Sequence, residues 1–352
     1  MSTSLYIRTY ILRFLQTLGR YCDLYLSTPL PRGPAFTRRI KSTVGDSPGE
    51  FELLFYTPPG YEKLGKEEKL PLLVNFHGGG YTIGNAADDA RFITTIQRRT
   101  PCLAVSISYR LAPSHPFPIG ITDCVTSLLY LWSHSTELSI DPSLTILTGF
   151  SAGGQFCYTS SYLLHSELSK STSIQIPNPN PNPTPLPQNS KEKESQAPGK
   201  IVGICTFYAP TNWTLTRLER AQSNPLTQPL SSLPGLFFPL FETAYFHPYA
   251  PSSLDFSSPL LSPGLAPDEL VREALPENLC LMTCEWDSLL VEGEVFRERL
   301  RGLGKRVEGY VVRGVPHGWD KWPSWWWGGG DRRRDEAYKF VGERVREFWG
   351  VG

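Results

Sequence analysis

Gly149-Phe150-Ser151-Ala152-Gly153-Gly154 joins two patterns of different kinds in this chain. The apolar run 144–148 before it predicts a buried strand, and the residues from Gln155 onward predict a helix. A Gly-x-Ser-x-Gly turn between a strand and a helix places its serine at the top of a sharp bend. The helix N-terminus behind that serine presents free backbone N–H groups to a developing anion. Alone, the motif fits an ordinary strand-to-helix turn equally well, so the rest of the chain must decide between the two interpretations.

Strand and helix patterns alternate on both sides of this turn. With 352 residues, the chain is long enough for one large domain or for a domain with a cap. The alternation predicts an α/β fold class with a mostly parallel central sheet and helices on both faces. Strands are predicted over 51–56, 70–76, 102–108, 144–148, 201–207, 278–283 and 307–312, and helices over 88–99, 121–134, 155–169, 291–300 and 331–349.

Composition excludes several classes of function. Lys plus Arg and Asp plus Glu each number 34, so no net charge attracts nucleic acid, and we expect no nucleic-acid partner. The seven cysteines lie mostly in apolar segments, without Cys-x-x-Cys or His-rich spacing. This pattern predicts neither a disulfide framework nor a metal site. We expect a cytoplasmic protein without a clear signal peptide and without a cofactor; no oligomeric state is predicted.

Residues 4–26 predict an amphipathic helix, because apolar side chains recur there every three or four positions. Arg8, Arg13 and Arg20 interrupt the run, which excludes a clean signal-peptide core and a bilayer span. The simpler interpretation is a helix whose apolar face packs over the protein's own core, as part of a lid. The alternative is peripheral contact of that face with a membrane surface.

Two later segments depart from the alternating pattern. Residues 171–199 carry Asn-Pro repeats followed by charged residues, which predicts a disordered surface insertion. Residues 208–260 gather aromatic side chains between two core strands, which predicts a cap segment whose aromatics fill the core, line a ligand site, or divide between both roles. We therefore expect an N-terminal helical cap segment over 1–48 and a main domain over 49–350 that contains both segments.

A serine nucleophile needs a base, and that base needs a group that orients it. Of the six histidines, only His317 lies in a short loop directly after a late core strand. Asp287 follows the preceding strand, from where its carboxylate can reach the far ring nitrogen of His317. Glu285 competes for this role, and Asp287 could instead cap the helix that begins at Ser288. The order Ser151, Asp287, His317 favours a catalytic triad.

A tetrahedral acyl intermediate also needs fixed N–H donors for its charged oxygen. Ala152, directly after the serine, supplies one. Three successive glycines follow the strand over 70–76, and they let the backbone approach a ligand closely. We predict Gly79 and Gly80 as the remaining donors, with His77 and Gly78 as supporting residues of the same loop.

Together these motifs resemble those of the hormone-sensitive-lipase-like α/β-hydrolases. The resemblance covers roughly residues 50–350 without the 171–199 insertion. It rests on His77-Gly78-Gly79-Gly80, Tyr109-Arg110-Leu111-Ala112-Pro113, Gly149-Phe150-Ser151-Ala152-Gly153-Gly154, Asp287-Ser288-Leu289 and His317-Gly318-Trp319.

The resemblance implies an α/β-hydrolase fold with a helical cap and hydrolysis of short- to medium-chain carboxylesters. It assigns Ser151 as the nucleophile that carries the acyl group, His317 as the base and Asp287 as the orienting acid. Gly79, Gly80 and Ala152 become the oxyanion donors. The implied partner is a small hydrophobic ester. We predict Tyr81, Trp213, Phe241 and Trp319 as substrate contacts.

One residue of the turn departs from the family pattern. The family usually has Asp before the nucleophile, and this chain has Phe150. That side chain points away from the reacting oxygen in such a turn, so we expect altered local support rather than lost chemistry.

Two other functions fit the same motifs. A non-catalytic small-molecule receptor on this fold is one, although receptors of this family have lost the histidine that is present here as His317. A pathway-specific hydrolase or acyltransferase that acts on an amide, lactone or thioester is the other, because its triad would look the same.

Overall fold

Short apolar runs form a central sheet that has nine strands in the described part of the chain. The computed structural model describes residues 3–26, 30–65, 67–173, 199–227, 233–247, 249, 253–321 and 330–351. The strands are β1 (Phe36–Lys41), β2 (Glu50–Tyr56), β3 (Leu70–Phe76), β4 (Leu103–Ser108), β5 (Ile140–Phe150), β6 (Ile201–Phe207), β7 (Asn278–Cys284), β8 (Arg306–Glu308) and β9 (Val311–Val312).

The strand order confirms the predicted mostly parallel sheet. It runs β1-β2-β4-β3-β5-β6-β7-β8, and β9 also pairs with β7. All pairs from β4 to β9 are parallel, whereas β1–β2 and β2–β4 are antiparallel. Parallel strands bring their carboxyl ends to one edge, so the loops after β3, β5, β6 and β7 meet there.

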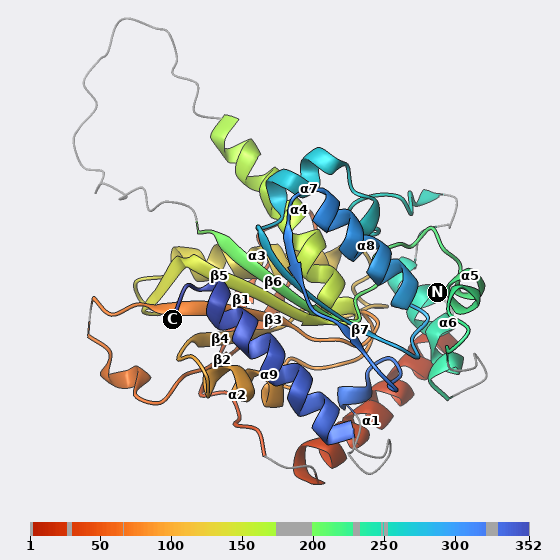
Figure 1. Ribbon diagram of the computed structural model, residues 1–352, viewed down its shortest axis with the longest axis horizontal. Coiled ribbons are helices and arrows are strands. Elements are labelled where there is room, and N and C mark those ends of the chain that lie inside the picture. Colours follow the sequence, from red (N-terminus) through yellow and green to blue (C-terminus); the bar gives the residue numbers. More distant parts are fainter. Residues whose placement is uncertain are drawn as a thin grey trace, which may run out of the picture.

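Helices cover both faces of this sheet, as predicted (Figure 1). On one face, α2 and α9 bury Phe92 and Val341 against the strands. On the other face, α3, α4 and α8 bury Leu128, Phe156 and Phe296, and α7 packs against α4. These helices are α2 (Ala90–Gln97), α3 (Ile119–Ser133), α4 (Ala152–Ser173), α7 (Asp268–Ala274), α8 (Leu290–Gly302) and α9 (Gly330–Phe348).

Three further helices gather at one end of the molecule, on the right in Figure 1. They are α1 (Thr3–Leu26) from the N-terminal segment and α5 (Arg217–Ser223) and α6 (Leu233–Phe246) from the mid-chain segment. α1 contacts α6, so the two segments predicted to form the cap lie together in space. No helix in the described residues is both long and apolar enough to cross a membrane.

The orientation of α1 differs from the simpler interpretation of its sequence. Its inward face is largely polar: Thr9 and Asp23 are buried, and Leu5 and Leu12 are its buried apolar residues among those whose side chains are described. Its outward face is apolar, and Phe14 at the middle of that face is 69% exposed. The large apolar residues of this outward face are Ile7, Tyr10, Ile11, Phe14, Leu15, Leu18 and Tyr21.

Polar contacts explain why the polar face of α1, and not its apolar face, points toward the rest of the protein. Arg13 donates from Nε to the carbonyl of Thr82 and from Nη2 to the carbonyl of Ala112, both at 2.8 Å. Gln16 and Arg20 both donate to the carboxylate of Asp88, at 2.9 Å each. The periodicity of α1 was therefore predicted correctly, but the expectation that its apolar face covers the core was wrong.

Two other predictions need correction. Residues 1–48 are not purely a helical cap segment, because β1 lies within them and pairs with β2 at the edge of the sheet. The strand predicted over 307–312 is divided into β8 and β9 at Gly309, whose φ is +106°. A Cβ there would lie 1.9 Å from the carbonyl oxygen of Leu281, so only glycine fits. The 171–199 insertion falls almost wholly outside the described residues, and α4 runs to Ser173 at its edge.

Candidate active site

The turn at the carboxyl end of β5 has the geometry that the sequence motif predicts. Ser151 has φ +51°, a left-handed conformation that costs free energy for any residue except glycine. A Cβ at Gly149 would lie 2.3 Å from the carbonyl oxygen of Gly153, and one at Gly153 would lie 1.9 Å from that of Phe76. The backbone N–H of Ser151 donates to the carbonyl of Phe207 at 2.9 Å. Close packing on both sides therefore holds the serine in its strained conformation.

Ser151, His317 and Asp287 form one continuous hydrogen-bonded chain. Nε2 of His317 lies 2.8 Å from Oγ of Ser151, and Nδ1 lies 2.6 Å from Oδ2 of Asp287. Asp287 is 3% exposed, whereas His317 keeps part of its ring accessible. The other carboxylate oxygen of Asp287 accepts from the backbone N–H of Leu289 at 3.0 Å. The carboxylate thus orients the ring from within the protein, and the serine oxygen lies on the ring's outer side.

The surroundings of His317 act on its pKa in opposite directions. Burial disfavours the charged imidazolium, while the charge and hydrogen bond of Asp287 and the charge of Asp320 favour it. The carboxylates prevail, so the pKa of His317 lies above its ordinary value. A base with a raised pKa accepts the serine proton more readily, which suits general base catalysis.

Glu285, the alternative acid, is committed elsewhere. Its carboxylate accepts from Arg313 at 2.6 Å and from the backbone N–H of Gly314 at 2.8 Å. The acid loop has a further support that the sequence did not indicate: Nδ2 of Asn224 donates to the carbonyls of Glu285 and Asp287, at 2.9 and 2.8 Å. Asn224 directly follows α5, so the mid-chain segment helps to hold the acid.

The glycine loop after β3 lies directly against the serine. A Cβ at Gly78 would approach Cβ of Ser151 to 3.6 Å. Gly79 and Gly80 have φ of +117° and +55°, and the carbonyl of Gly79 accepts from the backbone N–H groups of Thr82 and Ile83. Within the described residues, no backbone partner is recorded for the N–H groups of Gly79, Gly80 and Ala152. These three amides are therefore available to a charged oxygen at this site.

His77 has a supporting position in this loop. Its ring is buried, stacks on Tyr109 with centroids 4.2 Å apart, and contacts the carbonyl of Gly78 at 2.7 Å. The hydroxyl of Tyr109 donates to the carbonyl of His77 at 2.7 Å. Burial lowers the pKa of His77, so the ring stays neutral and anchors the glycine loop.

The four predicted substrate contacts lie in two different places. Tyr81 stacks on Tyr245 at 3.8 Å and donates its hydroxyl to Gln155, which also accepts from Nε1 of Trp213 at 3.2 Å. Phe241, on α6, lies over Gly80. Trp319 is 1% exposed and packs on Tyr208 behind the histidine loop, so the structure places it away from the other three.

Phe150, the residue that departs from the family pattern, points into the core. Its ring is fully buried and stacks on Phe207, with centroids 4.5 Å apart. Phe92 of α2 meets it edge-on at 5.2 Å. Nζ of Lys321 lies 3.5 Å from its ring centroid, which is a close cation–π contact. Apolar packing and one ammonium group therefore support the residue before the serine.

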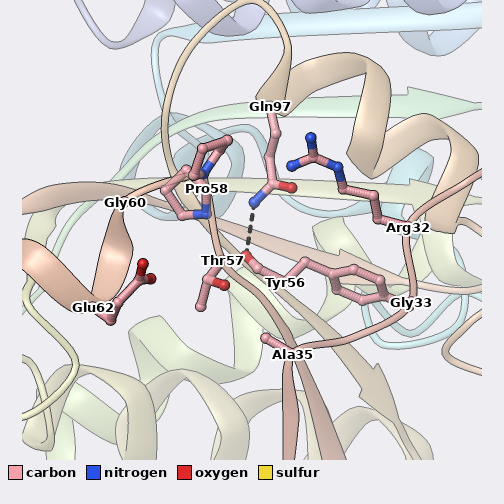
Figure 2. Close-up of a pocket in the computed structure, with 10 residues that line it drawn as sticks. Arg32, Gly33, Ala35, Tyr56, Thr57, Pro58, Gly60, Glu62 and Gln97 are labelled. Carbon is pink, nitrogen blue, oxygen red and sulfur yellow. Dashed lines mark hydrogen bonds between the residues drawn. The ribbon is translucent and has the colours of Figure 1, made fainter.

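A cavity of about 360 Å³ at the end of β2 belongs to a different part of the molecule (Figure 2). Gln97 donates to the carbonyl of Tyr56 in its wall at 2.7 Å. Tyr56 pairs with Ala104 near the start of β4, so the cavity lies at the amino edge of the parallel strands. Ser151 follows the carboxyl end of β5, at the opposite edge. No triad residue lines this cavity.

In the part of the chain that the structure describes, no group of three His, Cys, Asp or Glu side chains is arranged to hold a metal ion.

A family model described as alpha/beta hydrolase fold matches residues 73–321, more than two thirds of the chain. The chain belongs to this family. The membership confirms the resemblance to hormone-sensitive-lipase-like α/β-hydrolases and the predicted fold class. The matched range contains Ser151, Asp287 and His317, the residues that the structure brings together.

This α/β-hydrolase is similar to several named proteins. It is 28% identical to lipase 2 of a Moraxella species, over 69% of this chain and 53% of the lipase. It is 23% identical to an arylesterase of Saccharolobus solfataricus, over 86% of this chain and 83% of the arylesterase. The chain thus spans about half the length of the lipase.

Its fold matches that of a thermostable esterase from Pseudomonas putida with a TM-score of 0.72. The superposition covers 97% of this chain and 90% of the esterase, at 16% sequence identity. At this sequence identity the similarity shows a shared fold only. The shared fold extends over nearly the whole chain.

Proposed function

We propose that this α/β-hydrolase is a serine carboxylester hydrolase for small hydrophobic esters with short- to medium-chain acyl groups. The observation that carries the proposal is the hydrogen-bonded chain from Ser151 through His317 to Asp287, at 2.8 and 2.6 Å. The glycine loop beside Ser151 supports it, because an acyl-transfer site needs amide donors there. Similarity to an arylesterase and a lipase supports the substrate class.

The residues perform the reaction in two halves. Oγ of Ser151 attacks the ester carbonyl carbon while its proton moves to Nε2 of His317. The amides of Gly79, Gly80 and Ala152 stabilise the negative oxygen of the tetrahedral intermediate. The C–O bond to the alcohol then breaks, and His317 returns the proton to the departing oxygen. Water repeats the sequence on the acyl-enzyme and releases the acid, while Asp287 stabilises the imidazolium in both halves.

The test is hydrolysis of p-nitrophenyl acetate, butyrate and octanoate by wild type and Ser151→Ala. We expect the variant to lose at least about a thousandfold in kcat, because it has no nucleophile. Ser143→Ala, which removes an exposed serine of the same strand, is the matched control. Equal rates for wild type and Ser151→Ala would refute the proposal.

The same panel includes an anilide, a lactone and a thioester, since all three pass through the same acyl-enzyme. If the enzyme hydrolyses one of these three compounds faster than the p-nitrophenyl esters, the class of that compound replaces carboxylesters as the proposed substrate class. Binding of the esters without any turnover would instead assign the protein to the non-catalytic receptors.

A further inference from the structure

A chain of buried polar contacts lies behind the catalytic residues. Oγ1 of Thr148, on β5, donates to Oδ1 of Asn75, on β3, at 2.9 Å. Nδ2 of Asn75 donates to Oδ2 of Asp89 at 2.8 Å. Asp89, fully buried before α2, forms an ion pair with Nζ of Lys321 at 2.7 Å. The strands that carry the serine and the glycine loop are thus both connected to Lys321.

The chain continues from Lys321 toward the histidine. Nζ of Lys321 lies 2.9 Å from Oδ2 of the neighbouring Asp320, which also accepts from the hydroxyl of Tyr338 at 2.6 Å. Oδ1 of Asp320 accepts from the hydroxyl of Tyr208. The ring of Tyr208 meets the imidazole of His317 edge to face, with centroids 4.7 Å apart. Asp320 therefore holds the aromatic ring against which His317 packs.

The Lys321 ammonium stands between two buried carboxylates and one aromatic face. Asp89 and Asp320 flank it, and the ring of Phe150 covers it at 3.5 Å. Two carboxylates share one cation, so without Lys321 two buried negative charges would lose their ion-pair partner. Phe150 immediately precedes the nucleophile, so this contact joins the serine turn to the segment just after His317.

We propose that Lys321 is a positioning residue for His317, acting through Asp320 and Tyr208, and that Phe150 is the surface on which its ammonium rests. The inference rests on the proposed function, because it concerns the base of that reaction. It gives Phe150 a role in placing the base relative to the serine.

Besides these packing contacts, Lys321 also acts on the pKa of His317 through the charge of Asp320. The groups that face the imidazole are Asp287 after β7, Ser151 after β5, Tyr208 after β6 and Asp320 three residues after His317 itself. Lys321 forms an ion pair with Asp320 and partly neutralises it. Since the negative charge of Asp320 raises the pKa of His317, removing that carboxylate should lower it. Removing Lys321 should raise it further.

The experiment measures the rate at which a fluorophosphonate probe labels the enzyme as a function of pH. Oγ of the activated serine attacks the phosphorus of the probe and fluoride leaves, while the base takes the serine proton. Labelling therefore requires neutral His317 but no particular ester. The variants are Asp320→Asn and Lys321→Met, and Glu336→Gln and Lys339→Met on the exposed face of α9 are the matched controls. Circular dichroism and thermal unfolding show which variants are folded.

We expect the pH midpoint of the acid limb to fall by about half a pH unit in Asp320→Asn. In Lys321→Met the midpoint should rise by a similar amount. The controls should keep the wild-type profile. If the substitutions disturbed only the packing, labelling would slow in both variants. The pH midpoint would then not fall in Asp320→Asn and rise in Lys321→Met. Should Lys321→Met fail to fold, Asp320→Asn decides alone, because it keeps the ion pair between Lys321 and Asp89.

An unchanged or upward-moving limb in Asp320→Asn would overturn the inference. Failure of the proposed function looks different: Ser151→Ala would then be labelled as fast as wild type, or wild type would not be labelled at any pH.

Discussion

The ring of Phe241 lies directly over Gly80. A Cβ built on Gly80 would approach Cγ and Cδ2 of that ring to 2.7 Å each. Phe241 belongs to α6 and Gly80 to the loop after β3, so the mid-chain segment lies over the proposed oxyanion donors. We therefore expect a substrate bound to Ser151 to contact Phe241.

Shortening Phe241 should change the preferred acyl length. Phe241→Ala removes a ring beside the donors and leaves room for additional methylene groups, each worth about 0.8 kcal/mol when buried. We expect the ratio of kcat/KM for octanoate over acetate to rise by about tenfold. Leu240→Ala, from the same helix, is the control. An unchanged ratio in Phe241→Ala would exclude this residue from the acyl site.

Adding one methyl group to the glycine loop should abolish most of the activity. Gly80 has a positive φ, and an added Cβ would lie too close to the ring of Phe241, so the loop has to shift in Gly80→Ala. Its amide N–H groups then no longer point toward the charged oxygen of the intermediate. We expect kcat to fall by about 10²–10³, as for the loss of one oxyanion donor. Gly60→Ala is the matched control, because Gly60 also has a positive φ, +82°, but nothing lies within 4 Å of its added Cβ.

Activity should decline in mildly acidic solution. The base has to be neutral to accept the serine proton, and the folded protein raises the pKa of His317 above 6.5. As the pH falls through the raised pKa, the imidazole becomes protonated, so kcat/KM should show an acid limb with a midpoint above 6.5. A pH series with one p-nitrophenyl ester measures the midpoint.

Asp287→Asn provides the comparison for that profile. Without the carboxylate charge, the pKa of His317 loses its main raising influence, so the acid limb should move to lower pH. The variant should also lose about 10⁴-fold in kcat, since the ring is no longer oriented. A wild-type midpoint at or below 6.5 would contradict the raised pKa.

The apolar face of α1 is exposed, and we propose that it contacts a lipid surface. Phe14 and Leu18 lie near its centre, 69% and 55% exposed. Large apolar side chains on one face of a helix insert into the headgroup boundary of a bilayer. Phe14→Ser/Leu18→Ser should reduce the partition constant for phosphatidylglycerol-containing vesicles, measured by co-sedimentation, by about a hundredfold or more, since each side chain contributes roughly 1.5–3 kcal/mol when fully buried.

Hydrolysis of soluble p-nitrophenyl acetate should stay unchanged in this double variant. Val295→Ser, which changes an exposed valine on α8, is the control. Deleting α1 is a poorer test, because it also removes the hydrogen bonds of Arg13 to the loops at Thr82 and Ala112. A loss of self-association in chromatography, with vesicle binding unaltered, would assign the face to a second copy of the chain instead.

The sequence predicted most of the sheet, and it singled out Ser151, Asp287 and His317, which the structure joins by hydrogen bonds. Each of Ser151, Asp287 and His317 lies in the turn or loop after a predicted apolar strand, and the strand order brings the ends of those strands together. β3 and β6 have the predicted bounds, because both are short apolar runs with clear breakers at their ends. Local patterns thus determine the elements that carry the chemistry.

Features that depend on distant partners escaped prediction. β1 is rich in charge and half exposed, and only its pairing with β2 makes it a strand. The orientation of α1 depends on Asp88 and on carbonyls 69 and 99 positions from Arg13. Asn224 supports Asp287 from 63 positions away, and nothing in its local sequence marks it. For α1 and Asn224 the deciding partner lies more than 60 positions along the chain.

The inward polar face of α1 has a consequence for how firmly the helix is attached. A helix held by arginine and carboxylate groups leaves behind a surface that water can solvate, whereas a helix held by leucines leaves an apolar groove. Its attachment should therefore weaken with ionic strength rather than with loss of hydrophobic driving force. Arg13 bonds the carbonyl of Thr82, two residues after Gly80, so any movement of α1 acts on the loop that carries the oxyanion donors.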